Sequence, residues 1–363
     1  MKIRLAVSKY SIFACLVTLV FAVLCSTYFH VIGDISNYPL DSLWSRPGNI
    51  HDHFVYTQYG TNVERSGFKF LDNNFGMYWL YSYTQDGEKQ LFSHIANMLS
   101  IFVSAYAYYA ICVHFRLRIF SFMTFFLNTS LIYYSILINK DAFTISIFLL
   151  SLLFSLKRRY FSLLLLIIPA VIVRQQLAYF VATLFITAFL LSFYGKQRPR
   201  MLALYSVGIL SLTAIVVAIV MQSGKVMSIE SLGSGWTSEL ISFSVDFPAF
   251  AFLTVIPRII LYINDMFLSF RFFDDGKIDA ARILRIPAVI YIFYNAIFHL
   301  GIRSFYNSLN DRDFSIVVIS AVCALSAILL NPQINARYIT VVIPILILVI
   351  TIYKSRRRWI RTE

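Results

Sequence analysis

The stretch YYSILINKDAFTISIF, residues 133–148, places a lysine and an aspartate side by side between two apolar runs. The apolar residues continue up to Asn139-Lys140-Asp141 and resume at once, without Gly or Pro. With its flanks the stretch forms an apolar segment of 38 residues, Ile119 to Leu156, which as one helix would be about 57 Å long. A single bilayer crossing needs only about 20 residues. The segment is therefore predicted to be a helical hairpin with Asn139-Lys140-Asp141 at its turn.

The composition of the whole chain is that of a membrane protein. Of its 363 residues, 59% are hydrophobic and 13% are charged, and the mean hydropathy is +0.71, whereas a soluble domain has about 25% charged residues. The apolar runs are continuous, which favours transmembrane helices over the alternating strands of an outer-membrane barrel. We expect an all-α fold, a polytopic transmembrane helix bundle that forms a single integral membrane domain over residues 1–363.

The charges of the short loops predict how the chain crosses the membrane. With the N-terminus inside, the cytoplasmic segments hold 18 basic and 3 acidic residues, and the remaining segments hold 13 basic and 15 acidic residues. This asymmetry explains the net charge of +13 without nucleic acid as a partner, and it places both termini in the cytoplasm. The first run lacks a cleavage site and is predicted to be an uncleaved helix. About ten spans are expected, near 9–32, 92–115, 119–138, 142–156, 160–173, 177–194, 201–221, 286–302, 315–330 and 339–353.

Two long loops are predicted on the outer side, residues 33–91 and 222–285. The second contains an apolar stretch, 248–270, which is interrupted at Pro257-Arg258 and at Asn264-Asp265. Another full span here would move the basic C-terminus to the outside. The stretch is therefore predicted to be a re-entrant or interfacial helix pair.

Three predicted outer turns each carry one isolated cation, Lys140, Arg174 and Arg337. A cation on the outer side runs against the charge bias of the loops, and it is costly at membrane depth. Each has a structural alternative, because Lys140 could pair with Asp141 or snorkel to the interface, and the two arginines could cap helix carbonyls. All three lie on the predicted outer side of the membrane, which favours an anion site instead, since arginine and lysine bind phosphate and carboxylate groups. Amide side chains stand beside them, namely Asn139, Gln175, Gln176 and Asn335.

The first outer loop supplies acidic and aromatic residues. Asp34 directly follows the first span, and His51, Asp52 and His53 form a compact cluster. These groups could act as general base toward a sugar hydroxyl. No second cluster with metal-ligand spacing follows, and the four cysteines lie inside apolar runs, so neither a metal, a cofactor nor a disulfide framework is expected. The aromatic residues either form an interfacial belt or stack on sugar rings; they are Tyr56, Tyr59, Trp79 and Tyr81.

The short cytoplasmic loops leave no room for a nucleotide-binding fold, and the chain has no Gly-rich phosphate loop or nucleophile elbow. Any chemistry is therefore expected on the outer side, where a lipid-linked donor is available.

Three short motifs resemble those of bacterial O-antigen polymerases of the Wzy type: INKDAF (138–143), VRQQ (173–176) and NARYITVVIP (335–344). The resemblance implies polymerisation of undecaprenyl-diphosphate-linked oligosaccharide repeat units on the periplasmic face of the bacterial inner membrane. It also implies a chain-length regulator as a candidate partner.

Two alternatives remain. The large acidic first loop, with Asp34 directly after the first span, resembles GT-C glycosyltransferases, which use polyprenyl-phosphate sugars. A flippase or transporter of lipid-linked oligosaccharide is a third hypothesis. It is less favoured because transporters usually carry internal repeats, and none is evident here.

The polymerase and the GT-C hypotheses share one reaction, in which a sugar hydroxyl attacks an anomeric carbon and a polyprenyl phosphate or diphosphate leaves. The expected requirement is cations for the developing phosphate charge and a carboxylate for the proton. Asp34, Asp52 and Asp141 are the candidate bases, and Asp141 could alternatively orient Lys140. The residues expected to bind the diphosphate are Lys140, Arg174, Gln175, Arg258 and Arg337.

Overall fold

The computed structural model describes twelve parts of the chain, and the other residues are not described. The described residues are 76–77, 90–129, 131, 140–194, 197–222, 239–240, 242–243, 246–267, 273–274, 277–278, 283–330 and 336–360. Almost all of them are helical, as the sequence predicts, apart from a hairpin of two-residue strands, β1 (Phe273–Asp274) and β2 (Lys277–Ile278). The predicted first span near 9–32 lies outside this set.

Four helices in the described part are long and apolar enough to cross a bilayer. The stretches concerned are Ile95–His114, Arg198–Ile219, Arg312–Leu329 and Tyr338–Arg357. A fifth candidate is the pair α15 (Ile286–His299) and α16 (Ile302–Ser308), which is bent by 102°. The chain therefore has the helices of a membrane protein, while the expected ten spans and the orientation stay predictions.

The chain divides into two compact units, each described here by itself. Unit 1 comprises residues 1–153, 168–175 and 269–291. Its described elements are α5 (Gln90–His114), η4 (Ile119–Leu127), most of α7 (Asp141–Leu156), α9 (Ile167–Val173), the β1–β2 hairpin and the first turns of α15.

Small polar side chains join α5 to α7 inside unit 1. The hydroxyl groups of Ser104 and Ser146 lie 2.9 Å apart, and the Ser146 hydroxyl also donates to the carbonyl of Ser100. All three residues are buried. Serine hydroxyls are a common link between transmembrane helices, because their small size allows close approach. This contact fixes α7, and with it Lys140 and Asp141 at its beginning, against α5.

The expected span 119–138 begins as the 3₁₀ helix η4 and not as an α-helix. Its hydrogen bonds run over three residues, as in the bond from Ser121 N to the Arg118 carbonyl, and the Thr124 hydroxyl donates to the Ser121 carbonyl at 2.7 Å. The Tyr108 hydroxyl of α5 lies 2.6 Å from the same hydroxyl, and the Tyr108 ring packs at a tilt against Phe125. These side-chain contacts stabilise the 3₁₀ helix, whose turns are tighter than those of an α-helix.

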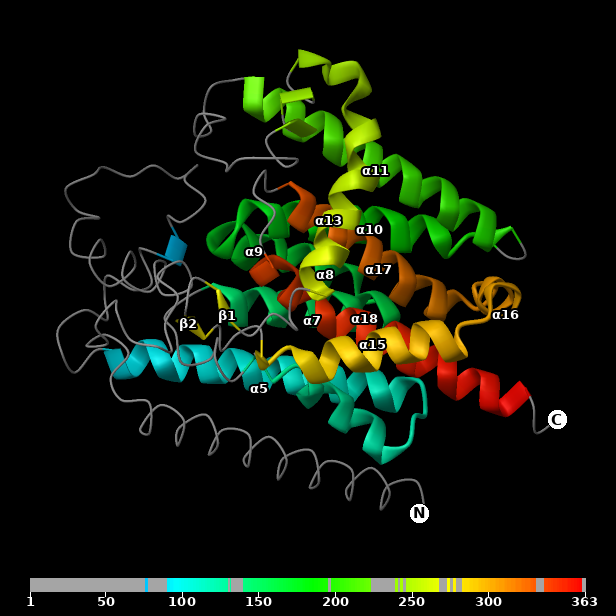
Figure 1. The fold of residues 1–363 in the computed structure, drawn as a ribbon. Coiled ribbons are helices and arrows are strands. Elements are labelled where there is room, and N and C mark those ends of the chain that lie inside the picture. Colours follow the sequence, from blue (N-terminus) through cyan, green and yellow to red (C-terminus); the bar gives the residue numbers. More distant parts are fainter. Residues whose placement is uncertain are drawn as a thin grey trace. The chain divides into compact units, whose positions relative to one another are not determined.

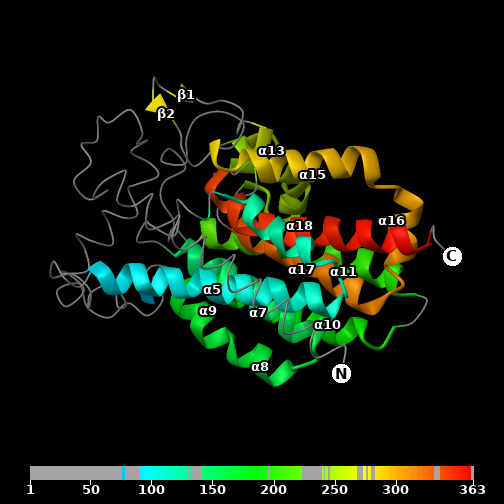
Figure 2. The ribbon, with the colours of Figure 1, turned by 90° about the horizontal axis from the view of Figure 1, so that it is seen from below.

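Unit 2 comprises residues 154–167, 176–268 and 292–363. It contains α8 (Tyr160–Leu165), α10 (Gln175–Leu191, from its second residue), α11 (Arg198–Gln222), η6 (Pro248–Thr254), α13 (Val255–Phe267), the rest of α15, α16, α17 (Arg312–Leu329) and α18 (Ala336–Ile360). Within this unit α17 packs along both α11 and α18. The neighbouring courses of α17 and α18 can be followed in both ribbon views (Figures 1 and 2).

The predicted helix pair over 248–270 is observed as η6 followed without a gap by α13. Pro257 falls in the first turn of α13, where the amide hydrogen that it lacks would have no helical partner. The proline therefore does not break the helix at this point, contrary to the interruption expected from the sequence.

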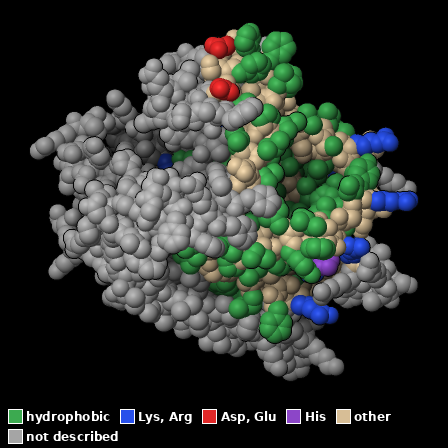
Figure 3. Space-filling view, viewed as in Figure 1, with side chains coloured by type: hydrophobic (Ala, Val, Ile, Leu, Met, Phe, Trp, Pro, Cys, Tyr) green, Lys and Arg blue, Asp and Glu red, His purple; other side chains and the backbone are tan. Residues whose placement is uncertain are grey.

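Large apolar side chains are exposed along several helices (Figure 3). Examples are Leu99, Phe161, Ile168, Ile297 and Ile302, of which Ile302 is 85% exposed. Soluble proteins rarely expose so much apolar surface, whereas a helix in a bilayer does so toward lipid.

Candidate functional site

The predicted turn at Lys140 and Asp141 is the beginning of α7. The carbonyl of Lys140 accepts the first helical hydrogen bond, from Thr144 N at 3.0 Å, so Lys140 takes the N-cap position and Asp141 is the first helical residue. An acidic side chain is favourable there because a helix N-terminus carries partial positive charge. Lys140 is 6% exposed and Asp141 is fully buried, so both charged residues of the predicted turn are removed from water.

Arg174 lies at the break between α9 and α10. Its backbone N–H donates to the Ala170 carbonyl at 2.8 Å, which continues α9, and α10 begins with the next residue, Gln175. Its guanidinium donates from Nη2 to Oδ1 of Asp141 at 2.9 Å, and the two side chains are 4% and 0% exposed. The structure thus joins two of the predicted turns, which are 33 residues apart in sequence, through a buried ion pair.

A buried ion pair such as Arg174–Asp141 is stable only in a defined geometry. Removing two charges from water costs several kcal/mol per ion, and the attraction between them offsets this only with good geometry and further hydrogen bonds. Lys140, Asp141 and Arg174 all have further contacts besides this pair. Arginine and lysine held away from water in this way bind phosphate oxygens strongly when such a group reaches them.

A residue of the predicted first outer loop lies against the same place. Gly76 is buried, and a Cβ atom on it would overlap the carbonyl oxygen and side chain of Ile172 in α9, two residues before Arg174. Only glycine allows an approach this close. The expectation that the first outer loop contributes to the site thus has a contact at residue 76, whereas Asp34 and Asp52, its candidate bases, lie outside the described residues.

The sequence interpretation overlooked Arg285, another buried cation of unit 1. It is 2% exposed and stands in the turn directly before α15. It directly precedes the apolar run IPAVIYIF, whereas Asp141 separates Lys140 from the run AFTISIF. This pattern of a cation followed at once by an apolar run was the signal that could have found it.

The two remaining predicted cations belong to unit 2. Arg258 in α13 is 3% exposed, and Tyr262, one turn later, is 2% exposed and donates to the Ile328 carbonyl of α17 at 3.5 Å. The opposite face of α13 exposes apolar side chains, Ile256, Ile260 and Ile263. Such a helix turns its polar side inward, as a membrane-embedded segment does.

Arg337 lies in the first turn of α18, which packs against α13; only the backbone of Arg337 is described. Of the other predicted groups, Gln175 is exposed at the start of α10. The structure therefore brings Lys140, Asp141 and Arg174 together in unit 1, and it brings the helices of Arg258 and Arg337 together in unit 2.

Comparisons with protein-family models, with curated proteins and with solved structures found no match to this chain. The functional argument consequently depends on the residues themselves.

Proposed function

We propose that the chain is an integral membrane glycosyltransferase of surface-polysaccharide assembly, an O-antigen polymerase that joins undecaprenyl-diphosphate-linked repeat units. In this proposal the chain crosses the inner membrane about ten times with both termini in the cytoplasm. The reaction takes place on the periplasmic face. The observation that carries the proposal is the buried Arg174–Asp141 pair beside Lys140, since it unites two of the three motifs on which the resemblance to these polymerases is based.

The lengths of the helices support an outer site below the lipid surface. Helix α7 has 16 residues and α10 has 17, so each is about 24–26 Å long, shorter than the hydrocarbon core of about 30 Å. If both begin in outer turns, Lys140 and Arg174 lie at the depth where the diphosphate of a polyprenyl lipid enters the membrane. Cations at that depth require an anionic partner.

The proposed reaction forms one C–O bond and breaks another. The hydroxyl of the acceptor sugar attacks the anomeric carbon of the donor, and the bond from that carbon to the diphosphate oxygen breaks. The electron pair leaves with the undecaprenyl diphosphate, whose charge Lys140 and Arg174 stabilise. A carboxylate accepts the hydroxyl proton.

Asp141 is better suited to positioning than to accepting this proton. Its Oδ1 atom accepts a hydrogen bond from the Arg174 guanidinium at 2.9 Å, so the carboxylate already holds one of the cations in position. Asp34 and Asp52 are the remaining candidates for the base in this proposal.

A GT-C-type transferase with a polyprenyl-phosphate sugar donor is the second candidate. The observation in its favour is the close packing of Gly76 on α9, because that class resembles this chain in its acidic first outer loop. Transport of lipid-linked oligosaccharide is the third.

The lipopolysaccharide profile of a deletion strain, with and without the restored gene, separates the three candidates. A polymerase gives core carrying a single repeat unit in the deletion strain and a full ladder on restoration. A ladder that persists with altered mobility or antigenicity indicates a decorating transferase and contradicts the polymerase. Loss of even the single repeat indicates transport or an earlier step. Restoration with Arg174→Ala at normal abundance should fail to rebuild the ladder.

A further inference from the structure

We propose that α16 is an interfacial helix, which lies on the surface of the bilayer and binds its anionic headgroups. In this arrangement Ile302 and Tyr306 enter the boundary of the hydrocarbon, and Arg303 contacts headgroup phosphates. The inference goes beyond the proposed function and does not depend on the reaction that the protein catalyses. It is based on the bend before α16, on the order of its faces and on its charge.

The bend between α15 and α16 turns the chain out of the direction of α15. The two helices meet at 102° across Leu300 and Gly301, and Figure 2 shows α16 turned in this way beside the end of α18. A helix at right angles to one that crosses the bilayer lies in the plane of the bilayer, as interfacial helices do. With α15 as a membrane-crossing helix, α16 therefore lies along the surface.

Two side chains from the end of α18 hold this bend within unit 2. The Tyr353 hydroxyl accepts the N–H of Gly301 at 3.2 Å and donates to the Gly301 carbonyl at 3.3 Å. The Arg357 guanidinium donates to the carbonyl of His299, the last residue of α15, at 2.6 Å. Backbone groups that a helix break frees in a membrane need such partners. The bend is therefore stabilised by specific contacts, which oppose the straightening of α15 and α16 into one span.

Two adjacent sides of α16 are apolar, and only one of them packs against the protein. Phe305 contacts Phe314 of α17 edge-on, with ring centroids 5.5 Å apart, and Leu309, one turn later, is buried. The neighbouring side carries Ile302 and Tyr306, again one turn apart. Ile302 is 85% exposed and Tyr306 is 48% exposed. An apolar side beside the protein-facing one is the side that a surface helix turns toward lipid, and tyrosine is typical of the membrane interface.

The third side of α16 is polar. It carries Arg303 and Asn307, which are one turn apart and exposed. Around the helix the order is thus a side that faces the protein, a side for lipid and a side for headgroups and water. The apolar surface also continues before the bend, because Ile297 and Phe298 in the last turn of α15 are exposed.

The charge of this region complements an anionic surface. The sequence segments 303–314 and 354–361 hold seven basic and two acidic residues. Both acidic residues are paired, Asp311 with Arg356 at 3.0 Å and Asp313 with Arg312 at 2.7 Å. Arg303 makes no ion pair with any residue in the described part of the chain, so its guanidinium is available to a phosphate. Basic residues beside an apolar helix face attract anionic lipids in this way.

Two other placements of α16 compete with the interfacial one. As the second half of a broken span, α16 would have all its exposed sides in the hydrocarbon. As a loop helix away from the membrane, it would have all of them in water. The three placements therefore differ in which of the exposed side chains lipid covers.

The test measures this difference with the full-length protein in nanodiscs of phosphatidylcholine and phosphatidylglycerol. Single cysteines are introduced as Ile302→Cys, Tyr306→Cys, Arg303→Cys and Asn307→Cys. A membrane-impermeant maleimide labels each variant, and the labelling of the wild-type protein is subtracted. All four positions are exposed in the protein, so protection comes from lipid. We expect labelling at 302 and 306 to be about 10-fold slower than at 303 and 307, because lipid excludes the reagent and raises the pKa of the thiol.

The headgroup contact is measured by native mass spectrometry of bound lipids. Arg303→Gln should weaken the binding of phosphatidylglycerol by about 5-fold, the usual contribution of one basic residue near an anionic surface. Its affinity for phosphatidylcholine should equal that of wild type. The matched control is Asn307→Ala on the same side of α16, which should bind both lipids as wild type does.

Each outcome decides. Slow labelling at 302 and 306 with fast labelling at 303 and 307 supports the interfacial helix. Slow labelling at all four positions would establish a broken span, and fast labelling at all four a helix in water, and either result overturns the inference. Equal binding of phosphatidylglycerol by Arg303→Gln and wild type would overturn the headgroup contact. If Ile302→Cys does not accumulate, the comparison of Tyr306→Cys with Asn307→Cys decides in the same way.

Discussion

Arg174 and Asp141 form a 2.9 Å ion pair that is almost completely buried, although they come from separate predicted hairpins. Arg174 stands between the end of α9 and the beginning of α10, and Asp141 begins α7. The pair therefore ties the beginnings of two helices to each other. Removal of one partner leaves the other charge buried, which is more harmful than removal of both.

Asp141→Asn should lower the free energy of unfolding by about 3–5 kcal/mol, because it leaves the Arg174 charge without its carboxylate. The measurement is the thermal unfolding of the purified protein in detergent. The double variant Arg174→Met/Asp141→Leu should be more stable than Asp141→Asn, although it should be inactive. A double variant less stable than either single one would contradict the interpretation of the pair as a mutually compensating contact.

The sequence identified the residues of this pair but not their pairing. Isolated cations in apolar surroundings, Lys140 and Arg174, are visible in the sequence because the bilayer excludes unpaired charge. The partner of Arg174 was not predicted, since Asp141 is adjacent to Lys140 and was considered either as a base or as the residue that orients Lys140, whereas helix packing brings Arg174 to the same carboxylate. Packing between hairpins has no local sequence signature, because lipid-facing and protein-facing apolar residues look alike.

The segment predicted as the second outer loop, residues 222–285, was harder still to interpret from sequence. Pro257 suggested a break, but a proline in the first turn is compatible with a helix, and α13 continues through it. Arg285 was overlooked because it was taken as the flank of a span. Its place directly before the apolar run that begins at residue 286 was nevertheless visible in the sequence.

Gly76→Ala should reduce activity and stability together. The added methyl group would overlap the Ile172 carbonyl, and either the first outer loop or α9 must move, next to Arg174. The matched control is Gly208→Ala in α11, where an added Cβ meets nothing within 4 Å, and where alanine should stabilise the helix by about 1 kcal/mol. The measurements are the lipopolysaccharide ladder and the Tm of both variants. Equal behaviour of the two variants would show that the approach of Gly76 to α9 is unimportant.

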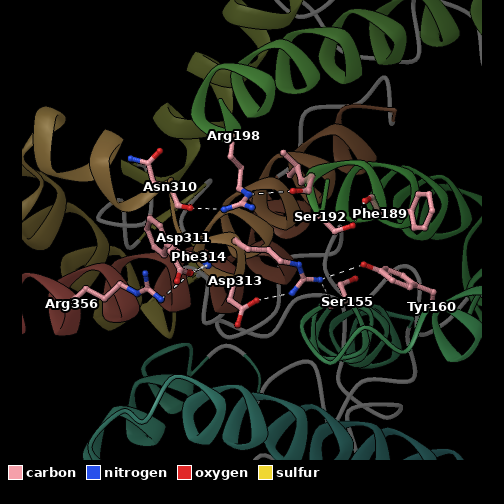
Figure 4. Close-up of polar contacts among 12 residues, drawn as sticks. Ser155, Tyr160, Phe189, Ser192, Arg198, Asn310, Asp311, Asp313, Phe314 and Arg356 are labelled. Atoms are coloured by element: carbon pink, nitrogen blue, oxygen red, sulfur yellow. Dashed lines mark hydrogen bonds and ion pairs between the residues drawn. The ribbon is translucent and has the colours of Figure 1, made fainter. Parts of the chain in front are cut away.

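Asp311 performs two separable tasks at the start of α17 (Figure 4). Its Oδ1 atom accepts the N–H of Phe314 at 2.8 Å as an N-cap, and it pairs with Arg356 of α18 at 3.0 Å. Asp311→Ala removes both interactions and should cost about 1–2 kcal/mol. Asp311→Asn keeps the cap and should cost no more than about 1 kcal/mol, since the ion pair is partly exposed. Thermal unfolding at low and high salt checks this, and an asparagine variant as unstable as the alanine variant would assign the stability to the ion pair.

Arg158 and Arg116 each occupy a left-handed position at a helix C-terminus, with φ of 56° and 52°. After α7, Arg158 N bonds the Ser155 carbonyl at 3.2 Å and Arg159 N bonds the Phe154 carbonyl at 2.8 Å, which is the Schellman arrangement that normally favours glycine. A side chain in this conformation costs about 1–2 kcal/mol relative to glycine. Its charge, which supports the predicted cytoplasmic location of this turn, is a reason to keep arginine there.

Arg158→Gly should therefore raise the free energy of unfolding of the purified protein by about 1 kcal/mol. It should also remove a positive charge that favours the cytoplasmic location of this turn. Because Arg158 is exposed, no packing is lost with its side chain. Arg158→Lys keeps the charge and the strained conformation, and it should change neither property. Reporter fusions after residue 159 measure the location of the turn, and thermal unfolding measures the stability. A glycine variant with a lower Tm than wild type would mean that the arginine side chain contributes more, through its attraction to the C-terminus of α7, than the strained backbone costs.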